Sequence, residues 1–270
     1  MTDVRREVLE RFHDHLHDAW RRLTLSIPGG WIEDRAGLTC MATGSTSPYF
    51  NLALSGSDLE DPRSALDGAL DRYGQAGLPW LLKLQPDRDR DLVAHAQHHG
   101  VGFEEQPVYR ISARSWDDPA PRPTASLSVV VAGRDTIGDA VRCFTEAFEA
   151  DPVDVGRELG PNLLTVPSFT LFVGYLSDEP VATSMLATTP SVGLAGVYSV
   201  ATRPSHRSRG FGTALTRAAV LAARAQGYDT VVLEPSPMGA PMYRRMGFEP
   251  FGTYLEAVMQ RATDRDRSRV

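Results

Sequence analysis

The sequence predicts a mixed α/β fold built from two related halves, each a mixed, mostly antiparallel sheet flanked by helices. Helical and strand-like patterns alternate through residues 126–260, and a similar order of elements runs through residues 1–114. The tripeptide Gly102-Phe103-Glu104 also recurs as Gly247-Phe248-Glu249, each time after a helix and before a final strand. We interpret the two halves as a diverged internal duplication.

The N-terminal half, residues 1–114, opens with a long amphipathic helix. Its apolar side chains recur at helical spacing from Val4 to Leu23. A second helix is expected to begin at Asp61-Pro62, because aspartate suits an N-cap and proline the first helical position. The other elements expected in this half are strands at residues 37–43, 49–56, 79–84 and 107–112 and a helix at residues 90–100.

The C-terminal half, residues 126–260, alternates more clearly. Its first amphipathic helix is followed by a loop and then by strand-like segments, two of which are joined by the turn at residues 177–180. A long helix is expected to end near Gly227, because helix C-termini favour glycine in left-handed backbone. The elements expected here are helices at residues 136–148, 211–227 and 240–248 and strands at residues 169–176, 181–188, 194–202, 230–235 and 253–260.

Two segments are expected to lie outside these halves. Residues 115–125 hold three prolines and little that can pack, so a linker is predicted there. Residues 261–270 are charged at almost every second position, and we expect a solvated tail.

The composition indicates an ordinary globular protein that is not built to bind polyanions. Hydrophobic residues make up 42% of the 270 residues, and the formal net charge is −6. An acidic chain argues against nucleic-acid and membrane-surface partners. The N-terminus lacks a signal-like apolar core and no apolar run is long enough to span a membrane, so a cytoplasmic location is expected. Cys40 and Cys143 lack a CxxC partner and are expected to be buried packing residues.

Histidines are concentrated near residues 13–17 and 95–99. His13 and His17 share one helix face and could bind a metal, but the sequence offers no third ligand. That face is also the polar side of an amphipathic helix. We therefore expect solvated histidines and no bound metal.

The stretch at residues 206–215 alternates arginines with glycines immediately before an apolar helix. The first turn of a helix has backbone N–H groups without intrahelical acceptors, and the helix dipole adds positive charge there. Gly210 and Gly212 would let the backbone approach an anion closely, while Arg207 and Arg209 add side-chain charge. A solvated strand–helix turn would have a similar composition. The position between a predicted strand and a long apolar helix favours a phosphate site.

Two motifs at a fitting separation carry a family resemblance. The first is Arg207-Ser208-Arg209-Gly210-Phe211-Gly212, which matches the pattern (Q/R)xxGx(G/A). The second is Tyr243, placed four residues before Gly247-Phe248. On these motifs, residues 126–260 resemble an acyl-CoA N-acyltransferase of the GNAT superfamily, and the chain as a whole resembles a tandem GNAT protein with a degenerate N-terminal half.

The resemblance implies acetyl-CoA as co-substrate, with no metal. The strand before the loop would separate from its neighbour, so that Val200 and Thr202 pair with pantetheine and the Val200 N–H stabilises the oxyanion. The loop amides from Ser208 to Thr213 would hold the pyrophosphate. The residues expected to bind the cofactor are Val200, Thr202, Arg207, Ser208, Arg209, Gly210, Phe211, Gly212, Thr213 and Ser236.

Tyr243 resembles the general acid of the family, which protonates the departing thiolate. A free tyrosine titrates near pH 10 and a thiol near about 8.5, so a phenol can supply that proton. A core tyrosine that only packs its short helix is the alternative interpretation.

The sequence departs from the family pattern at two places. Ser236 stands where many members have asparagine, and residues 194–202 hold no carboxylate to act as base on the amine. Glu234, beside the expected cleft, is a candidate base acting through water, although a strand-end carboxylate paired with an arginine is the commoner arrangement. Tyr198 is expected either to line the acceptor pocket or to belong to the core.

Acidic residues also stand where acceptor determinants are usual and where the N-terminal half would need a cofactor loop. Glu146, Glu149 and Asp151 would attract an amine, although solvated acids at a helix end are the commoner explanation. Asp58 and Glu60, together with Asp61, would repel a pyrophosphate. The N-terminal half is therefore expected to be structural or to wall the acceptor site.

These observations predict an enzyme that moves an acetyl group from acetyl-CoA to a primary amine by direct attack in a ternary complex. The alternative is an acyl-CoA-binding regulatory or scaffold protein with weak catalysis, a hypothesis motivated by the missing strand carboxylate. An amine-bearing acceptor is the expected partner. The acceptor's identity and the oligomeric state stay open, with a homodimer as one option.

Overall fold

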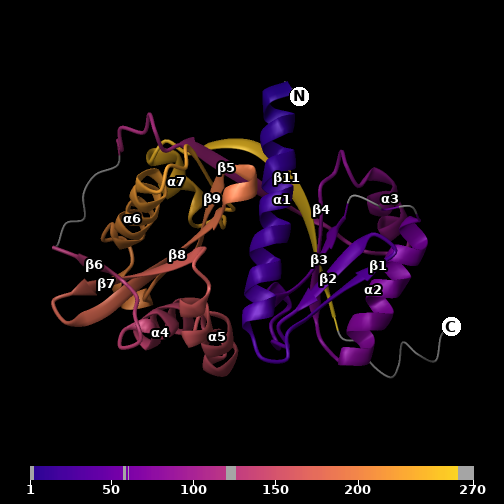
Figure 1. Ribbon diagram of the computed structural model, residues 1–270, viewed down its shortest axis with the longest axis horizontal. Coiled ribbons are helices and arrows are strands. Elements are labelled where there is room, and N and C mark those ends of the chain that lie inside the picture. The colour runs from indigo at the N-terminus through magenta and orange to yellow at the C-terminus, as the bar shows by residue number, and fades with distance from the viewer. Residues whose placement is uncertain (1–2, 57–58, 60, 120–125, 261–270) are drawn as a thin grey trace. The chain divides into compact units, whose positions relative to one another are not determined.

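The computed structural model describes residues 3–56, 59, 61–119 and 126–260. The chain divides into two compact units (Figure 1). The first combines residues 1–19 with residues 107–252, and the second combines residues 20–106 with the chain from Thr253 onward. The units differ from the linear organisation expected from the sequence, because the start of the first helix belongs with the C-terminal half. The tail expected at residues 261–270 lies outside the described residues.

The first unit holds a mixed sheet in the order β5-β10-β9-β8-β7-β6. Its strands are β5 (Glu104–Ser112), β6 (Ser128–Val131), β7 (Phe169–Leu176), β8 (Glu179–Thr189), β9 (Leu194–Thr202) and β10 (Thr230–Leu233). All neighbouring pairs in this order are antiparallel except β9 and β10, which run parallel. The mixed α/β fold predicted from the sequence is confirmed.

Helices cover both faces of this sheet. They are α4 (Ile137–Phe148), α5 (Pro152–Glu158), α6 (Phe211–Ala225) and α7 (Ala240–Arg245). Both α4 and α6 pack against β8 and β9, from opposite faces (Figure 1). The core under α6 includes Val197, Phe211 and Leu215. Gly227 has a φ of 87° at the end of α6, as predicted.

The second unit has a sheet in the order β1-β2-β3-β4-β11. Its elements are β1 (Trp31–Arg35), β2 (Leu38–Ala42), β3 (Asn51–Ser55), α2 (Pro62–Ala76), β4 (Trp80–Leu84), α3 (Arg90–His98) and the larger part of β11 (Glu249–Met259). Here too one parallel pair, β3 with β4, lies among antiparallel pairs. Helix α2 begins as predicted, because the Asp61 carboxylate accepts hydrogen bonds from the amides of Arg63 and Ser64.

The final strands of the two sequence halves are exchanged between the units. Strand β5 ends the N-terminal half but pairs with β10 in the first unit, where Ile111 faces Val231. Strand β11 ends the C-terminal half but pairs with β4 in the second unit, where Ala257 faces Leu82. The duplicated Gly-Phe-Glu tripeptides stand at corresponding places, since Glu104 and Glu249 are the first residues of β5 and β11.

Two elements were not expected from the sequence. Strand β1 pairs with β2 across a tight turn at residues 36–37. Helix α5 forms inside the segment expected to be a loop, and Asp151 caps it by accepting hydrogen bonds from the amides of Val153 and Asp154. The Asp151-Pro152 pair is the same start signal that identified α2 at Asp61-Pro62, so the sequence did contain the information.

The described beginning of the linker expected at residues 115–125 packs on the first unit, although little in this segment was expected to pack. Trp116 is buried, and its indole N–H donates to the Met246 carbonyl over 2.7 Å. Asp118 forms an ion pair with the buried Arg217 on α6. A large aromatic side chain can anchor a segment whose prolines exclude regular structure. Residues 120–125 lie outside the described part of the chain.

The expectation of solvated histidines is wrong for the first helix, α1 (Asp3–Ser26). His13 and His15 are buried, with 2% and 0% of their surface exposed. His15 is held by hydrogen bonds to Thr189 and Tyr198, which follow it by 174 and 183 residues. The helix therefore buries part of the face that its polar residues had suggested would be exposed.

We predict that Trp116 is an anchor of the first unit. Trp116→Ala should lower the free energy of unfolding by about 3 kcal/mol, because it removes a buried aromatic side chain. Trp116→Phe keeps most of the packing and should cost about 1 kcal/mol for the lost hydrogen bond. Urea denaturation followed by circular dichroism measures both changes. An unchanged midpoint for the alanine variant would contradict the anchoring role.

Candidate active site

Strands β9 and β10 pair only over their first few residues. Their parallel register joins Leu194 with Thr230 and continues to Gly196 with Val232. Beyond this row β10 ends at Leu233, whereas β9 runs on to Thr202. The edge of β9 from Val197 onward therefore faces a gap in the sheet, as the family resemblance implied. Backbone N–H and C=O groups along such an edge can pair with an extended ligand.

A β-bulge interrupts β9 within this gap. Thr183 of β8 pairs with Ala201 and Met185 pairs with Tyr198, so Ser199 and Val200 together face the single residue between them. Ser199 has a φ of 51°, a left-handed conformation uncommon for a residue other than glycine. A bulge leaves one residue outside the regular ladder and re-aims its backbone groups. The bulge thus falls on the residue whose amide was predicted to face the thioester oxygen, Val200.

The N-terminus of α6 is built to expose backbone amides. Gly210 is its N-cap with a φ of 82°, and Ser208 just before it has a φ of 61°. Among the residues that the structure describes, no side chain caps this helix. The amides of Phe211, Gly212 and Thr213 lie in the first turn and have no acceptor within the helix. Left-handed residues next to a helix start form an anion-binding concavity.

Close packing beside the loop favours a small residue at position 212. A Cβ there would lie 3.3 Å from the Met242 sulfur and 3.6 Å from the Thr202 Oγ1. The loop, the end of β9 and helix α7 therefore meet at this point.

The two arginines of the loop have different surroundings. The Arg207 guanidinium donates to the Ala147 carbonyl over 2.6 Å and, at 3.4 Å, to the Thr202 carbonyl. Arg207 thus ties the loop to the ends of α4 and β9. The guanidinium carbon of Arg209 lies 5.2 Å from the centre of the Phe211 ring. A cation–π contact of this kind orients the charge beside the exposed amides.

Tyr243 on α7 is buried against the core of the first unit. Its ring packs edge-on against Phe248 with centroids 5.8 Å apart, and its side chain hydrogen-bonds with Thr216. Burial raises the pKa of the Tyr243 phenol, and its side-chain hydrogen bond with Thr216 lowers that pKa in part. Thr216 in turn donates to the Gly212 carbonyl over 2.9 Å. The phenol is therefore connected to the helix that carries the loop, through a threonine that the sequence analysis missed.

The residues after β10 line the other side of the gap. Ser236 accepts a hydrogen bond from the Gly239 amide over 3.1 Å, so its hydroxyl helps to start α7. Glu234 comes directly after β10, level with Tyr198 on β9 by continuation of the register. Burial raises the pKa of Tyr198, and the negative charge of Glu234 raises it further. Tyr198 and Glu234 thus stand together where the strands part.

Several acidic and thiol groups have structural surroundings. Glu146 forms a 2.6 Å ion pair with Arg203, and Asp151 caps α5. Glu149 is exposed at the C-terminal end of α4. Cys143 is fully buried, and burial raises its thiol pKa to about 12, which agrees with a packing role.

The corresponding helix of the second unit has its own anion at the N-terminus. The Asp61 carboxylate accepts from two amides of α2 and from the Ser64 hydroxyl. These hydrogen bonds lower the pKa of Asp61, and the bond from the Ser64 hydroxyl has the largest effect. Strand β3 also ends at Ser55, one residue beyond its last paired row with β4, so no comparable gap opens between these described strands. Asp58 and Glu60 lie outside the described residues.

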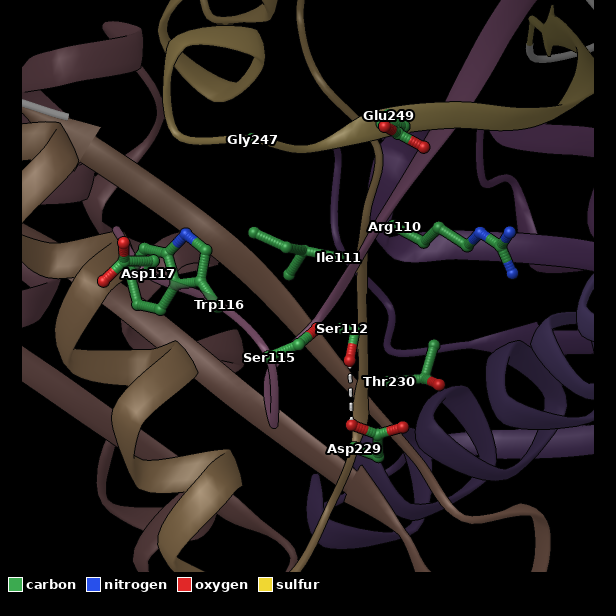
Figure 2. A pocket seen from close by; sticks show the side chains of 10 residues that line it. All are labelled: Arg110, Ile111, Ser112, Ser115, Trp116, Asp117, Asp229, Thr230, Gly247 and Glu249. Atoms are coloured by element: carbon green, nitrogen blue, oxygen red, sulfur yellow. Dashed lines mark hydrogen bonds between the residues drawn. The ribbon is translucent and has the colours of Figure 1, made fainter. Parts of the chain in front are cut away.

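A separate pocket of about 470 Å³ lies in the first unit, where β5 ends and β10 begins (Figure 2). Figure 2 shows Asp229 accepting a hydrogen bond from Ser112, with Trp116 and Glu249 also on the lining. The described residues that line it include none of the predicted site residues. The pocket is next to the paired ends of β9 and β10, away from the loop at residues 207–212.

Comparison with known proteins supports the same location. The model of the acetyltransferase (GNAT) family matches residues 135–248, which include β9, the loop, α6 and Tyr243. Over residues 135–248 the chain matches the acetyltransferase domain of the GNAT family. Acyl transfer is the class of chemistry that this domain supports. A search of curated proteins found no match.

Solved structures with the GNAT fold cover nearly the whole chain. A GCN5-related N-acetyltransferase from Kribbella flavida is 20% identical, with a TM-score of 0.71 and coverage of 92% of this chain and 94% of that one. One from Sphaerobacter thermophilus is 18% identical, with a TM-score of 0.57 and coverage of 84% and 78%. A tandem GNAT protein from the clavulanic acid biosynthesis pathway is 14% identical, with a TM-score of 0.57 and coverage of 82% and 78%. At these identities the likeness concerns the fold.

Within the described parts of the chain, no group of three or more histidine, cysteine or acidic side chains is placed to hold a metal ion. None of the described helices is both long and apolar enough to cross a membrane.

We predict that the GNAT loop binds coenzyme through its open amides. Gly210→Asp puts a carboxylate at the anion site and should weaken acetyl-CoA binding at least about 100-fold, because like charges replace a favourable contact. Gly227→Asp is a matched control, since Gly227 is also left-handed and lies just past the other end of α6. Titration calorimetry should show near-parental affinity for the control. Equal loss in both variants would indicate a general defect of the helix.

We also predict a stoichiometry of about one acetyl-CoA per chain, because Asp61 occupies the helix start in the second unit. Calorimetry of the parent protein measures this directly. A second equivalent that persists in Gly210→Asp would contradict the expected absence of a site at α2.

Proposed function

We propose that this GNAT protein transfers an acetyl group from acetyl-CoA to a primary amine, by direct attack in a ternary complex. The observation that carries the proposal is the gap between β9 and β10, which joins a bulged strand to an uncapped, glycine-rich helix start. An extended pantetheine chain could pair along β9 while the pyrophosphate rests on α6. Bound acetyl-CoA supplies the reactive thioester and a thiolate leaving group.

The chain would then assist the transfer with two groups at the gap. The Val200 amide, re-aimed by the bulge, would donate to the oxygen on which negative charge develops. The Tyr243 phenol would give a proton to the departing sulfur. Its raised pKa keeps the phenol protonated at neutral pH, so a hydroxyl proton is present as the sulfur departs.

Charge beside the gap suits a cationic acceptor. Glu234 stands at the end of β10 near Tyr198, so its carboxylate would attract an ammonium group toward the bulged strand. Glu234 also remains our candidate for a base acting through water. Glu146 and Asp151 are engaged with Arg203 and the start of α5, which argues against a first role in acceptor binding.

We predict that Tyr243→Phe lowers the rate of acetyl transfer about 100-fold while the affinity for acetyl-CoA changes less than about twofold. The ring and its packing on Phe248 remain, and only the hydroxyl is lost. Thiol release during incubation with a panel of amines measures the rate, and calorimetry measures the affinity. Tyr175→Phe is the control, because its hydroxyl bonds to Asp139 over 2.6 Å, away from the gap.

Two results would count against this assignment. A parental rate in Tyr243→Phe would exclude the general-acid role. Tight acetyl-CoA binding without turnover on any amine would instead favour an acyl-CoA-binding regulatory or scaffold protein.

A further inference from the structure

Helix α1 brings a histidine to the catalytic face of the first unit. We infer that His15 takes up the proton released by the acceptor amine, through the hydroxyl of Tyr198. The inference rests on the proposed amine acetylation and supplies the base that β9 lacks, since residues 194–202 contain no carboxylate. Tyr198 would touch the acceptor, and His15 would act behind it as a positioning and proton-holding residue.

The two side chains are joined by a short hydrogen bond. The His15 Nε2 lies 2.9 Å from the Tyr198 Oη, and the rings are nearly parallel, at 11°. The other imidazole nitrogen, Nδ1, lies 2.8 Å from the Thr189 Oγ1. If Nδ1–H donates to the threonine, Nε2 is left to accept from the tyrosine hydroxyl. The imidazole is then set in the form that can receive a proton from Tyr198.

Burial separates the two roles. His15 has no exposed surface, whereas Tyr198 is only partly buried. Tyr198 is thus the member of the pair that an acceptor amine would approach, with the imidazole behind it. Tyr198 follows the last paired residue of β9, Gly196, by two positions, and its ring lies back along the strand against Gly196.

Gly196 makes this contact possible. A Cβ on Gly196 would lie 2.4 Å from the Tyr198 ring and 2.5 Å from the His15 Nε2. Contacts this short do not occur, so the tyrosine lies along its own strand only because position 196 has no side chain. Glycine in the middle of a strand weakens the strand. The close approach of the two rings is a specific reason for its presence here.

Helix α1 is fixed to the sheet one turn before His15. The Arg11 guanidinium donates to the Val192 carbonyl over 2.9 Å and to the Gly193 carbonyl over 3.2 Å, at the turn between β8 and β9. Arg11 and His15 are spaced by four residues and therefore share one face of the helix. Phe12 is fully buried and packs edge-on against Phe251. These contacts hold the imidazole at a set position against β8 and β9.

The amine nitrogen forms its bond to the acyl carbon as the carbon–sulfur bond breaks, and the sulfur takes a proton from Tyr243, which regains one from solvent. The proton released by the amine passes to the Tyr198 oxygen, while the tyrosine passes its own proton to the His15 Nε2. Tyr198 ends neutral and His15 ends as imidazolium, with Nδ1–H still bonded to Thr189. The proton then returns to solvent by the same path. The negative charge of Glu234 near Tyr198 and the positive charge of Arg11, one turn from His15, are the charged groups facing this pair.

The test compares Tyr198→Phe and His15→Gln, alone and together, with His17→Gln as the control on the same helix. Glutamine can keep hydrogen bonds but does not titrate between pH 5 and 9. Acetyl-CoA titration first establishes that each variant is folded and binds coenzyme. Steady-state rates are then measured from pH 5 to 9 with the best amine of the panel, alongside Glu234→Gln.

We expect Tyr198→Phe and His15→Gln each to lower kcat about 100-fold with coenzyme affinity unchanged, and the double variant to be no slower than the slower single variant. The parent rate should fall as pH drops below neutrality, because protonated His15 cannot accept a proton. His15→Gln should lose this acid limb, while Glu234→Gln and His17→Gln keep it.

Three results would overturn the relay. These are a parental kcat in Tyr198→Phe, an acid limb that persists in His15→Gln, or loss of that limb in Glu234→Gln alone. In each case amine acetylation by the parent would stand. A parent that binds acetyl-CoA but acetylates no amine would overturn the proposed function and the relay together.

Discussion

The site depends on the interruption of one parallel strand pair. After Gly196 and Val232, strands β9 and β10 no longer bond to each other, and the sheet loses ladder hydrogen bonds that it would otherwise make. Leaving polar backbone groups without partners is costly unless water or a ligand pairs with them. The bulge at Ser199, the positive φ values at Ser208 and Gly210 and the absence of a side-chain cap on α6 all lie within reach of this interruption. These features leave several backbone groups of β9 and α6 open to a ligand, as binding sites often do.

The two units show that a helix N-terminus open to an anion differs little from one that its own side chain caps. Helices α2 and α6 each follow the first strand of a parallel pair, and each has 15 residues. At α2 the Asp61 carboxylate meets the first amides, so the helix supplies its own anion. At α6 a left-handed glycine takes the cap position and leaves those amides to a ligand. At the N-cap position, a side chain that bonds to the first amides stabilises the helix, whereas a glycine leaves those amides free to bind an anion.

Local patterns predicted most of the first unit. The bounds of β9 and the positions of α4 and α6 follow from periodicity, and the motif at residues 207–212 predicted the loop before α6. Contacts between distant segments could not be obtained in this way. Nothing near His15 in the sequence indicates that its partners come 174 and 183 residues later, and its neighbours Asp14 and His17 favour a solvated face. The packing of Trp116 was missed for a related reason. The neighbouring prolines indicate a backbone without regular structure, but they do not reveal that the Trp116 side chain bonds to Met246.

The exchange of β5 and β11 has a consequence for the history of the chain. Once each repeat has given its last strand to the other, neither repeat can be lost or inherited alone. Removal of the N-terminal half would strip β5 from β10 and expose a strand edge of the kind that invites aggregation. The half without a glycine-rich loop would thus be kept, since the other half still needs its strand. Such an exchange of strands would allow the sequence of one half to change while selection keeps that half in the chain.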